Sequence, residues 1–482
     1  MSKFLKYMTI SPSDTVRSAM ININKNLTGT VFILQKKKIQ GVVTDGDIRR
    51  YLIKKKSLNA KISLLIKKKF ISINNSASRE EIFRITQKYK HSIRVFPVIN
   101  KNKELIDFIF DNKIHKIPIY KPYLQGNEKK YLLDCVTNNW ISSVGSFVLK
   151  FENKFSKIHS NRKAVSVTSG TTALHLALVS LGVGKGDEVI VPNLTFAAVI
   201  NAVLYTGAKP VIVDIDRYKW TIDCLEIEKN ITKKTKVIIP VHIFGNPCPM
   251  EKIMKIAKKN KIYVVEDCAE AIGSKYKNKN IGTFGDCSIF SFFGNKTITT
   301  GEGGMILFKS TKHQLIAKKL RDHGMSKKKK YYHDNIGFNY RMTNMQAAIG
   351  MAQLEKYNEI IKKKIYIANL YKKKLGNNQN IIFQKDEIKC INSFWAVALQ
   401  IKKNKFSFSA CEEKLINMGI ETRNFFYPLS EQKIYKRYTV KKKYNTENFV
   451  KKGLLLPTFP SLSNSNIDYI SKNLVKFLNN LN

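Results

Sequence analysis

The sequence lacks the features that mark secreted or membrane-spanning chains. It has only seven cysteines among 482 residues, an odd number with no CxxC pair. This pattern argues against a disulfide scaffold or a zinc site, and it predicts reduced thiols in a cytoplasmic protein that holds no metal. No run of about 18 apolar residues occurs, so we expect no membrane-spanning helix. The opening residues, MSKFLKYMTISPSD, lack the apolar core of a secretory signal.

Arginine and acidic residues are scarce beside a large excess of lysine. The chain has 12 arginines against 72 lysines, and its formal net charge is +48. Such an excess is typical of proteins that bind nucleic acids or anionic membranes. Specific recognition of phosphates and bases relies on arginine, however, and the lysines are spread along the whole chain. We therefore interpret the excess lysines as solvated surface residues and expect no nucleic-acid partner. The positive electrostatic field of the protein would still attract an anionic substrate.

The length predicts more than one domain, because 482 residues are too many for one compact core. The 43% of hydrophobic residues and 25% of charged residues are ordinary for a globular protein and exclude a disordered chain. Changes of pattern along the chain predict a front domain at residues 1–115, a large domain at 117–360 and a small C-terminal domain at 361–482.

The front domain consists of two similar halves of about 50 residues each. In the first half, GVVTDGDIRR at residues 41–50 indicates a strand, a polar turn and a helix start. Thr44 and Asp47 would lie at that junction, where hydroxyl, carboxylate and free N–H groups suit a ribose or a phosphate. Alternatively, Asp47 only caps the helix and the domain is a docking module. The sequence leaves both interpretations open.

This front region resembles a tandem pair of CBS domains. Gly41, Thr44 and Asp47 match the signature in the first half, whereas the second half has no matching Thr and Asp and offers the stretch 104–107 instead. The resemblance implies a regulatory site for a nucleotide, and it leaves open whether this pair still binds one.

From residue 117 onward, strand-like and helical segments alternate. KAVSVTSG, DEVIVP, KPVIVDID, TKVIIPVHIFG and KIYVVED are rich in Val and Ile, and helical stretches such as TTALHLALVSLG separate them. This pattern predicts an α/β fold with a mostly parallel sheet that is covered on both faces. Functional groups are then expected at the carboxyl ends of the strands.

Two of these strand ends carry polar residues. Ser169, Gly170, Thr171 and Thr172 open a helix directly after a strand, so that hydroxyls, free N–H groups and the helix dipole could bind an anion. Asp267 ends the strand in KIYVVEDCAEA and could hold a protonated ring nitrogen. Taken alone, each site is better explained as a helix cap.

A lysine in an apolar setting is the third candidate. Lys296 follows the aromatic run SIFSFF, which includes Phe292 and Phe293. A poorly hydrated amine loses its proton more readily, and a neutral amine is what a Schiff base requires. Together, an anion site, a carboxylate for a ring nitrogen and an amine for an imine are the complement of pyridoxal 5′-phosphate.

Residues 117–482 resemble the DegT/DnrJ/EryC1/StrS family of sugar-nucleotide aminotransferases. The matching stretches are SGTTALHLAL, GDEVIVPNLTFAA, GAKPVIVDID, VVEDCAEAIGSKY, GTFGDCSIFSFFGNKTITTGEGGM, GFNYRMTNMQAAIGMAQLE and GIETRNFFYPL. The resemblance implies the type I fold of pyridoxal phosphate enzymes, in which a mostly parallel sheet is followed by a smaller C-terminal α/β domain. The stretches FFGNKTITTGEGGM, DCAEA and TRNFFYPL look most like those of perosamine synthases.

The resemblance also implies a role for each matched residue. Lys296 falls on the lysine that binds the cofactor and moves protons, and Asp267 falls on the partner of the pyridine nitrogen. Phe196 falls on the aromatic residue that covers the ring, and Glu270 lies near the ring hydroxyl and the substrate. The phosphate contacts fall on Gly170, Thr171, Thr172 and Ser291.

Two further residues imply an assembly. Asn339 matches the residue that reaches the phosphate from a partner subunit, and Arg341 lies beside it in GFNYRM. The resemblance therefore implies a homodimer with shared active sites.

The implied reaction transfers an amino group from L-glutamate to the 4-keto group of a nucleotide-linked sugar. The expected substrate is GDP-4-keto-6-deoxy-D-mannose, which would give GDP-perosamine for a surface polysaccharide. UDP- and dTDP-linked sugars remain alternatives, because Asn424 and Ser430 stand where relatives often have Pro and His.

Two other function classes are disfavoured. Keto-sugar 3-dehydratases of the same fold carry His at the lysine position, and Lys296 argues against that activity. A non-catalytic regulator would need a basic recognition helix, and no such pattern stands out. His242, in VHIFG, is interpreted as a packed residue at a strand end.

Overall fold

The computed structural model describes residues 7–54, 57–77, 79–89, 92–110, 117–326, 328–440 and 444–481. It divides into two compact units. The N-terminal unit comprises Met1–Ile117 with Ile416–Ile420, and the main unit comprises Pro118–Leu415 with Glu421–Asn482. Within the described ranges, no helix is both long and apolar enough to span a bilayer.

The N-terminal unit repeats one order of elements. The first half contains β1 (Thr9–Ile10), α1 (Val16–Asn26), β2 (Thr30–Gln35), β3 (Lys38–Thr44) and α2 (Asp45–Ile53), and a 3₁₀ turn follows at Ile62–Leu65. The second half contains β4 (Ile73–Asn74), α3 (Arg79–Tyr89), β5 (Val95–Ile99) and β6 (Leu105–Phe110). In each half the first strand runs parallel to the second and the second antiparallel to the third. The internal repeat predicted from the sequence is therefore present in the fold.

Helix α1 shows why these short segments fold as they do. The Thr15 side chain accepts a hydrogen bond from the Ser18 N–H and caps the helix, which ends at Leu27 in a left-handed conformation. Val16, Ala19 and Ile23 lie on one face at helical spacing and are buried in a core with strand residues.

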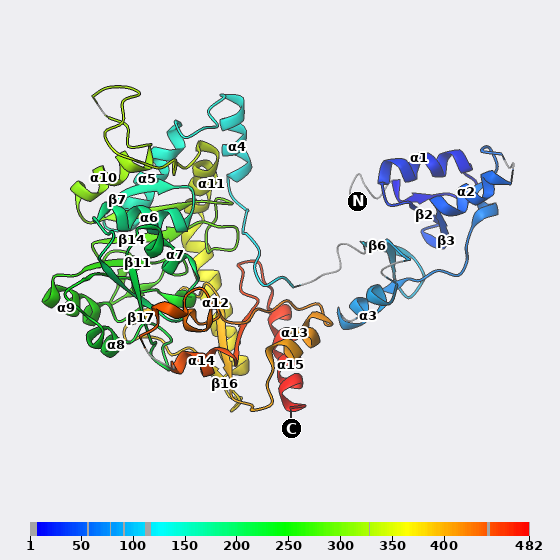
Figure 1. Cartoon of the computed structure of the whole chain (residues 1–482). Helices are drawn as coiled ribbons and strands as arrows, with labels where there is room; N and C mark the ends of the chain where they lie inside the picture. Colours follow the sequence, from blue (N-terminus) through cyan, green and yellow to red (C-terminus); the bar gives the residue numbers. More distant parts are fainter. Residues whose placement is uncertain are drawn as a thin grey trace. The chain divides into compact units, whose positions relative to one another are not determined.

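The main unit is built on a seven-stranded sheet, which includes the strands labelled β7, β11 and β14 in Figure 1. Its strands lie in the order β7-β15-β14-β11-β10-β8-β9. All of them are parallel except β15, which runs antiparallel to β14 and β7. The bounds are β7 (Lys163–Val167), β8 (Glu188–Pro192), β9 (Lys209–Val213), β10 (Thr235–Ile238), β11 (Tyr263–Asp267), β14 (Cys287–Ser291) and β15 (Gly304–Phe308).

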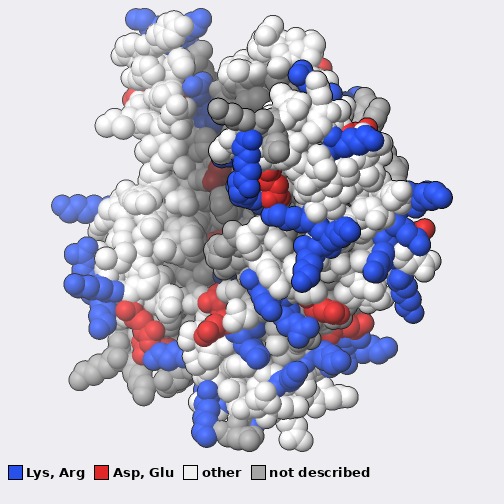
Figure 2. Space-filling model, turned by 90° about the vertical axis from the view of Figure 1, so that its right-hand side faces the viewer, with Lys and Arg blue, Asp and Glu red and all other residues white. Residues whose placement is uncertain are grey.

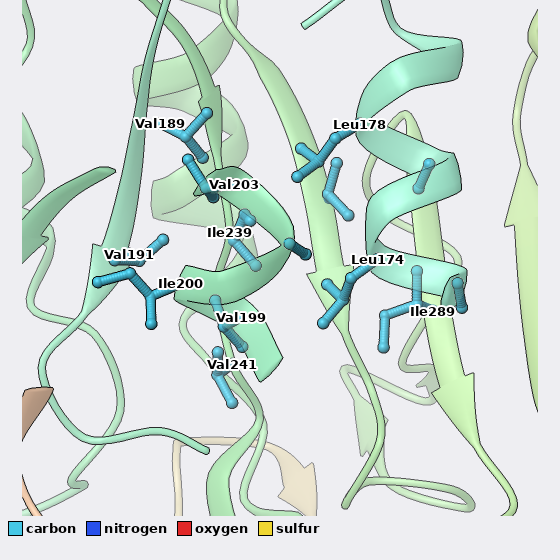
Figure 3. Packing of buried hydrophobic residues seen from close by; sticks show 14 of the residues in the cluster. Leu174, Leu178, Val189, Val191, Val199, Ile200, Val203, Ile239, Val241 and Ile289 are labelled. Atoms are coloured by element: carbon cyan, nitrogen blue, oxygen red, sulfur yellow. The ribbon is translucent and has the colours of Figure 1, made fainter. Parts of the chain in front are cut away.

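Helices cover both faces of this sheet, as near-continuous apolar strands require. Val189 and Val191 of β8 join one hydrophobic cluster, whereas Ile190 between them joins the other. The first cluster includes α6 (Gly170–Ser180), α7 (Ala198–Tyr205) and α10 (Thr311–Arg321). The second includes α5 (Ser146–Ile158), α9 (Met250–Asn260) and α11 (Asn344–Glu355). Figure 3 shows Leu174 and Leu178 of α6 and Val199 and Val203 of α7 packed over the strands.

The C-terminal part of the main unit adds an antiparallel sheet of β16 (Ile381–Phe383), β18 (Val397–Ile401) and β19 (Gly453–Leu456). Its helices are α12 (Tyr357–Leu375), α13 (Phe408–Ile416), α14 (Asn445–Val450) and α15 (Asn464–Asn479). Elsewhere in the unit lie α4 (Glu128–Thr137), α8 (Cys224–Lys229), β12 (Lys275–Tyr276), β13 (Lys279–Asn280) and β17 (Cys390–Ile391).

The α/β fold class expected from the sequence is confirmed. The boundary expected at residue 360 stays a prediction, because residues on both sides of it belong to one compact unit.

The surface agrees with the interpretation of the charge. Lys and Arg side chains are scattered over the face shown in Figure 2, among uncharged residues and fewer acidic ones. All seven cysteines are unpaired thiols, and five of them are buried.

Candidate active site

A cavity of about 320 Å³ lies at the carboxyl ends of the central strands. The strands β7, β11 and β14 end at Val167, Asp267 and Ser291, and the turns that follow them border the cavity. The topology therefore brings together side chains that lie more than 100 residues apart in the sequence. The predicted site residues that line the cavity are Gly170, Thr171, Phe196, Asp267, Glu270, Ser291 and Lys296.

The N-terminus of α6 forms one end of this cavity. Ser169 caps the helix by accepting a hydrogen bond from the Thr172 N–H, and the Thr172 side chain accepts one from the Ser169 N–H. Thr172 therefore holds the turn in shape, and its hydroxyl is engaged within the cap. The first-turn N–H groups of a helix have no partner inside it and suit an anion.

Gly170 leaves the space that an anion would need beside Ser291. A Cβ added at Gly170 would lie 2.9 Å from the Ser291 Cβ, which is closer than real Cβ atoms approach. Ser291 is buried at the end of β14 and lines the same cavity.

Asp267 presents a buried carboxylate to the cavity. Its Oδ1 accepts a hydrogen bond of 2.9 Å from the Ala269 N–H. Burial raises the pKa of Asp267, and the Ala269 N–H and the nearby charge of Lys296 offset this only in part. A buried carboxylate of this kind is stabilised by a further donor or cation, which a protonated ring nitrogen would supply.

Lys296 lies within reach of a second carboxylate. Its Nζ is 3.5 Å from Glu270 Oε1, and its side chain is 14% exposed. Glu270 Oε2 accepts a hydrogen bond of 2.9 Å from the Phe244 N–H. Burial raises the pKa of Glu270, and the charge of Lys296 opposes this shift. Lys296 and Glu270 therefore form an ion pair within the cavity.

The aromatic residues around Lys296 differ from those expected from the sequence, which were Phe292 and Phe293. Phe292 is fully buried, but Phe293 is 47% exposed and borders the cavity. The indole of Trp395 lies beneath the amine, with Lys296 Nζ 4.6 Å from its ring centroid. Sequence reasoning missed Trp395, because it follows Lys296 by about 100 residues and the stretch SFWAV carries no recognisable signal.

Phe196 lies at the rim of the cavity. Its ring is 60% exposed and lies 5.7 Å from the ring of Phe426. It is therefore free to cover a planar ring bound below it.

Asn339 and Arg341 lie outside the lining of this cavity. Asn339 forms a backbone bridge with Asp322, and Arg341 pairs with the Asp322 carboxylate at 3.0 Å. Within one chain they do not join the other site residues, so a contribution across subunits stays a prediction.

His242 contacts a buried acid behind the cavity. His242, Glu266 and Cys268 hold their ligand atoms within 4.8 Å of one another. The Glu266 carboxylate, however, accepts hydrogen bonds from three backbone N–H groups, and His242 Nδ1 accepts one of 2.9 Å from the Cys248 N–H. These contacts support the interpretation of His242 as a packed residue.

In the N-terminal unit, Thr44 is the helix cap and Asp47 completes a capping box with it. Asp47 also pairs with Lys67 at 2.6 Å and with Arg50 at 2.5 Å. Burial raises the pKa of Asp47, but Lys67, Thr44 and Arg50 outweigh it and lower the value to about 2. Thr44 is thus the N-cap residue, and Asp47 contributes to the cap from the third helical position.

A second cavity, of about 820 Å³, lies in this unit. Thr44 lines it together with three lysines and one arginine, namely Lys67, Lys68, Lys69 and Arg94. Asp47 does not line it.

Comparison with known families agrees with this geometry. The sequence model of the DegT/DnrJ/EryC1/StrS aminotransferase family matches residues 122–475, and that of the CBS domain matches residues 1–54. The chain is 45% identical over 361 residues to a GDP-perosamine synthase of Escherichia coli O157:H7, covering 75% of this chain and 98% of that protein. It is 38% identical over 370 residues to a GDP-perosamine synthase of Vibrio cholerae, covering 75% and 99%.

Solved structures share the fold of the main unit. Helicobacter pylori PseC, an aminotransferase involved in the biosynthesis of pseudoaminic acid, superposes with a TM-score of 0.72 at 26% identity and covers 76% of this chain and 99% of its own. DesV of S. venezuelae, solved in complex with a ketimine intermediate, superposes with a TM-score of 0.69 at 26% identity and covers 74% and 95%.

The raised pKa of Glu270 predicts a pH-dependent cost to stability. Because the folded state holds this proton more tightly than the unfolded state does, the stability contributed by protonated Glu270 is lost as pH rises above the ordinary Glu value. Glu270→Gln mimics the protonated form. We therefore expect the cofactor-free variant to gain in melting temperature over the wild type as pH rises from about 4 to about 7.

Glu251→Gln is the control, since the exposed Glu251 is held by Lys277, which lowers the pKa of Glu251. We expect Glu251→Gln to lose slightly in melting temperature relative to the wild type as pH rises over the same range. A wild type that gains stability over Glu270→Gln with rising pH would contradict the assignment.

Proposed function

The chain belongs to the DegT/DnrJ/EryC1/StrS aminotransferase family, and from this premise we propose that it makes GDP-perosamine. The reaction would move an amino group from L-glutamate to the 4-keto group of GDP-4-keto-6-deoxy-D-mannose, for use in a surface polysaccharide. The observation that carries the proposal is one cavity that holds Lys296, Asp267 and the start of α6, in a chain 45% identical to a GDP-perosamine synthase. Its unpaired cysteines support action in the cytoplasm.

Enzymes of this family use pyridoxal 5′-phosphate, and the cavity fits this cofactor. The phosphate would lie at the N-terminus of α6, where Gly170 leaves room beside Ser291. The ring nitrogen would face the buried Asp267, and the aldehyde would face the amine of Lys296. When bound, the cofactor supplies an electron sink for the carbon that loses its proton.

The chain's own residues would supply the proton transfers. Lys296 acts as general base and acid at the substrate carbon, and its amine lies 3.5 Å from Glu270, which can accept or return a proton. Asp267 keeps the ring nitrogen protonated. Leu174, Val199 and Ile289 line the cavity with apolar surface. This surface excludes water and so strengthens the electrostatic interactions among the charged groups.

Other sugar nucleotides are the alternative substrates. One argument for them is that Asn424 and Ser430 replace the usual Pro and His, and the structure shows where these two residues lie. Ser430 is buried in a network with Asn193 and Glu447, and neither Ser430 nor Asn424 lines the cavity. The two departures from the usual Pro and His therefore do not change a wall of the cavity. A 3-dehydratase is disfavoured by the amine of Lys296.

The direct test offers the purified protein L-glutamate and a panel of 4-keto-6-deoxy sugars linked to GDP, UDP or dTDP. We expect an amino-sugar from the GDP substrate, identified by mass, and 2-oxoglutarate in equal amount. Lys296→Ala should lower the rate by roughly 10³-fold or more, because it removes the proton-transfer group. Preference for another nucleotide would overturn the substrate, and a deoxygenated product would overturn the reaction class.

We further propose a homodimer with shared active sites. Large apolar side chains are exposed on α4 and in the segment that follows it: Leu133, Val136, Trp140, Ile141 and Val144. Such a surface is typical of an interface between subunits. Asn339 and Arg341, which lie outside their own cavity, would then reach the partner's phosphate site.

Subunit mixing tests the shared site. Lys296→Ala and Asn339→Ala should each be poorly active alone. If Asn339 serves the partner, a hybrid dimer has one intact site, and a mixed sample should recover about a quarter of wild-type activity. Mixing that restores nothing, with hybrids verified by native mass spectrometry, would contradict the sharing.

For the N-terminal unit we propose a regulatory nucleotide in the cavity of about 820 Å³. The match to the CBS domain supports a nucleotide site, and Lys68, Lys69 and Arg94, which line the cavity beside the Asp47-paired Lys67, suit a phosphate chain. Because Asp47 is already paired with Lys67 and Arg50, the ribose contact would come from Thr44 or its neighbours.

Calorimetry on the full chain with adenine and cytidine nucleotides tests this site. We expect binding that Lys68→Ala and Arg94→Ala each weaken by roughly tenfold, as loss of a phosphate contact does. Lys101→Ala, at an exposed residue outside the cavity lining, is the matched control. Absence of binding by every nucleotide would reduce the unit to a docking module.

A further inference from the structure

A buried lysine lies near the active site. Lys364 belongs to α12 and is 3% exposed. Its Nζ donates hydrogen bonds to the backbone carbonyls of Trp395 at 3.2 Å and Thr458 at 3.0 Å. In the described part of the chain, no carboxylate forms an ion pair with it.

This arrangement is costly, because a buried amine loses its hydration. Burial lowers the pKa of Lys364 to about 7. An apolar side chain of similar volume would avoid this cost. The contacts of Lys364 therefore point to a role other than filling the core.

The residue held by Lys364 is the aromatic partner of the catalytic amine. The Trp395 indole N–H donates a hydrogen bond of 2.9 Å to the carbonyl of Asn295, the residue that precedes Lys296. Its ring centroid lies 4.6 Å from Lys296 Nζ. Tyr120 stacks on the indole with a centroid separation of 4.9 Å.

The second carbonyl held by Lys364 is tied to the same segment. The Thr458 hydroxyl accepts a hydrogen bond of 3.0 Å from the Val397 N–H, two residues after Trp395. Lys364 thus fixes Trp395 directly through its carbonyl and indirectly through Thr458.

We propose that Lys364 is a positioning residue for the active site: it holds the Trp395 backbone so that the indole stays against Lys296 and the Asn295 carbonyl. This inference rests on the proposed function, in which Lys296 carries the cofactor and moves the proton. Lys364 lies outside the lining of the active-site cavity, so we expect its effect to be on the rate of the proton transfers and not on the binding of sugar or glutamate.

Fluorine NMR of protein labelled with 5-fluorotryptophan tests the contact without relying on activity. The chain has three tryptophans, and the signal of Trp395 is assigned by its loss in Trp395→Phe. Lys364→Met should shift the Trp395 signal and leave those of Trp140 and Trp220 unchanged. We expect kcat to fall roughly tenfold with KM within about twofold, because only positioning is lost. Lys364→Arg, which keeps a cationic donor, should restore part of the rate.

Lys374→Met is the matched control, since Lys374 also lies on α12 and pairs with Asp468. It should alter neither the signal nor kcat. The double variant Lys364→Met with Trp395→Phe should be no slower than Trp395→Phe alone, because both changes remove one interaction.

An unchanged Trp395 signal in folded Lys364→Met would overturn the inference. If Lys364→Met does not fold, Trp395→Phe decides the matter: an unaltered kcat in that variant overturns the inference, and a fall of roughly tenfold supports it. Failure of the proposed function is distinguishable, because the wild type would then transfer no amino group while the fluorine signal still reported the contact.

Discussion

The active site depends on keeping one lysine amine out of water next to two buried carboxylates. Lys296 contacts Glu270 and the indole of Trp395, and its charge also acts on Asp267. Burial raises the pKa of both acids, and the charge of Lys296 opposes this shift in each of them. In the proposed reaction, the same low-polarity setting that shifts these pKa values would favour proton transfer.

The sheet supplies the rigidity that this arrangement needs. Parallel strands place their carboxyl ends at one edge, and helices packed on both faces fix each strand in register. The C-terminal part contributes Trp395 to the lining of the cavity. Trp395 precedes β18, and its carbonyl accepts a hydrogen bond from Lys364 of α12. A site assembled from such distant segments is sensitive to changes far from the reacting atoms.

Residues at strand ends could be predicted from the sequence, because a strand followed by a helix start fixes where the polar groups lie. Gly170 and Asp267 are of this kind, whereas Lys296 is predicted from the apolar aromatic run that precedes it, and all three line the cavity. Thr172 lies where it was expected, but its hydroxyl closes the helix cap. Trp395 could not be predicted, because nothing in the stretch SFWAV indicates that it packs against Lys296 in the fold. The pairing of Asp47 with Lys67 likewise depends on tertiary contact.

The central claim is that one particular amine, out of the 72 lysines in the chain, binds the cofactor aldehyde. Reduction of the purified protein with borohydride in the presence of pyridoxal 5′-phosphate, followed by peptide mass spectrometry, tests it directly. The account predicts one dominant reduced adduct, on Lys296, formed at a stoichiometry near one per chain and absent from Lys296→Ala. Labelling distributed over surface lysines, with Lys296 unmodified, would contradict it.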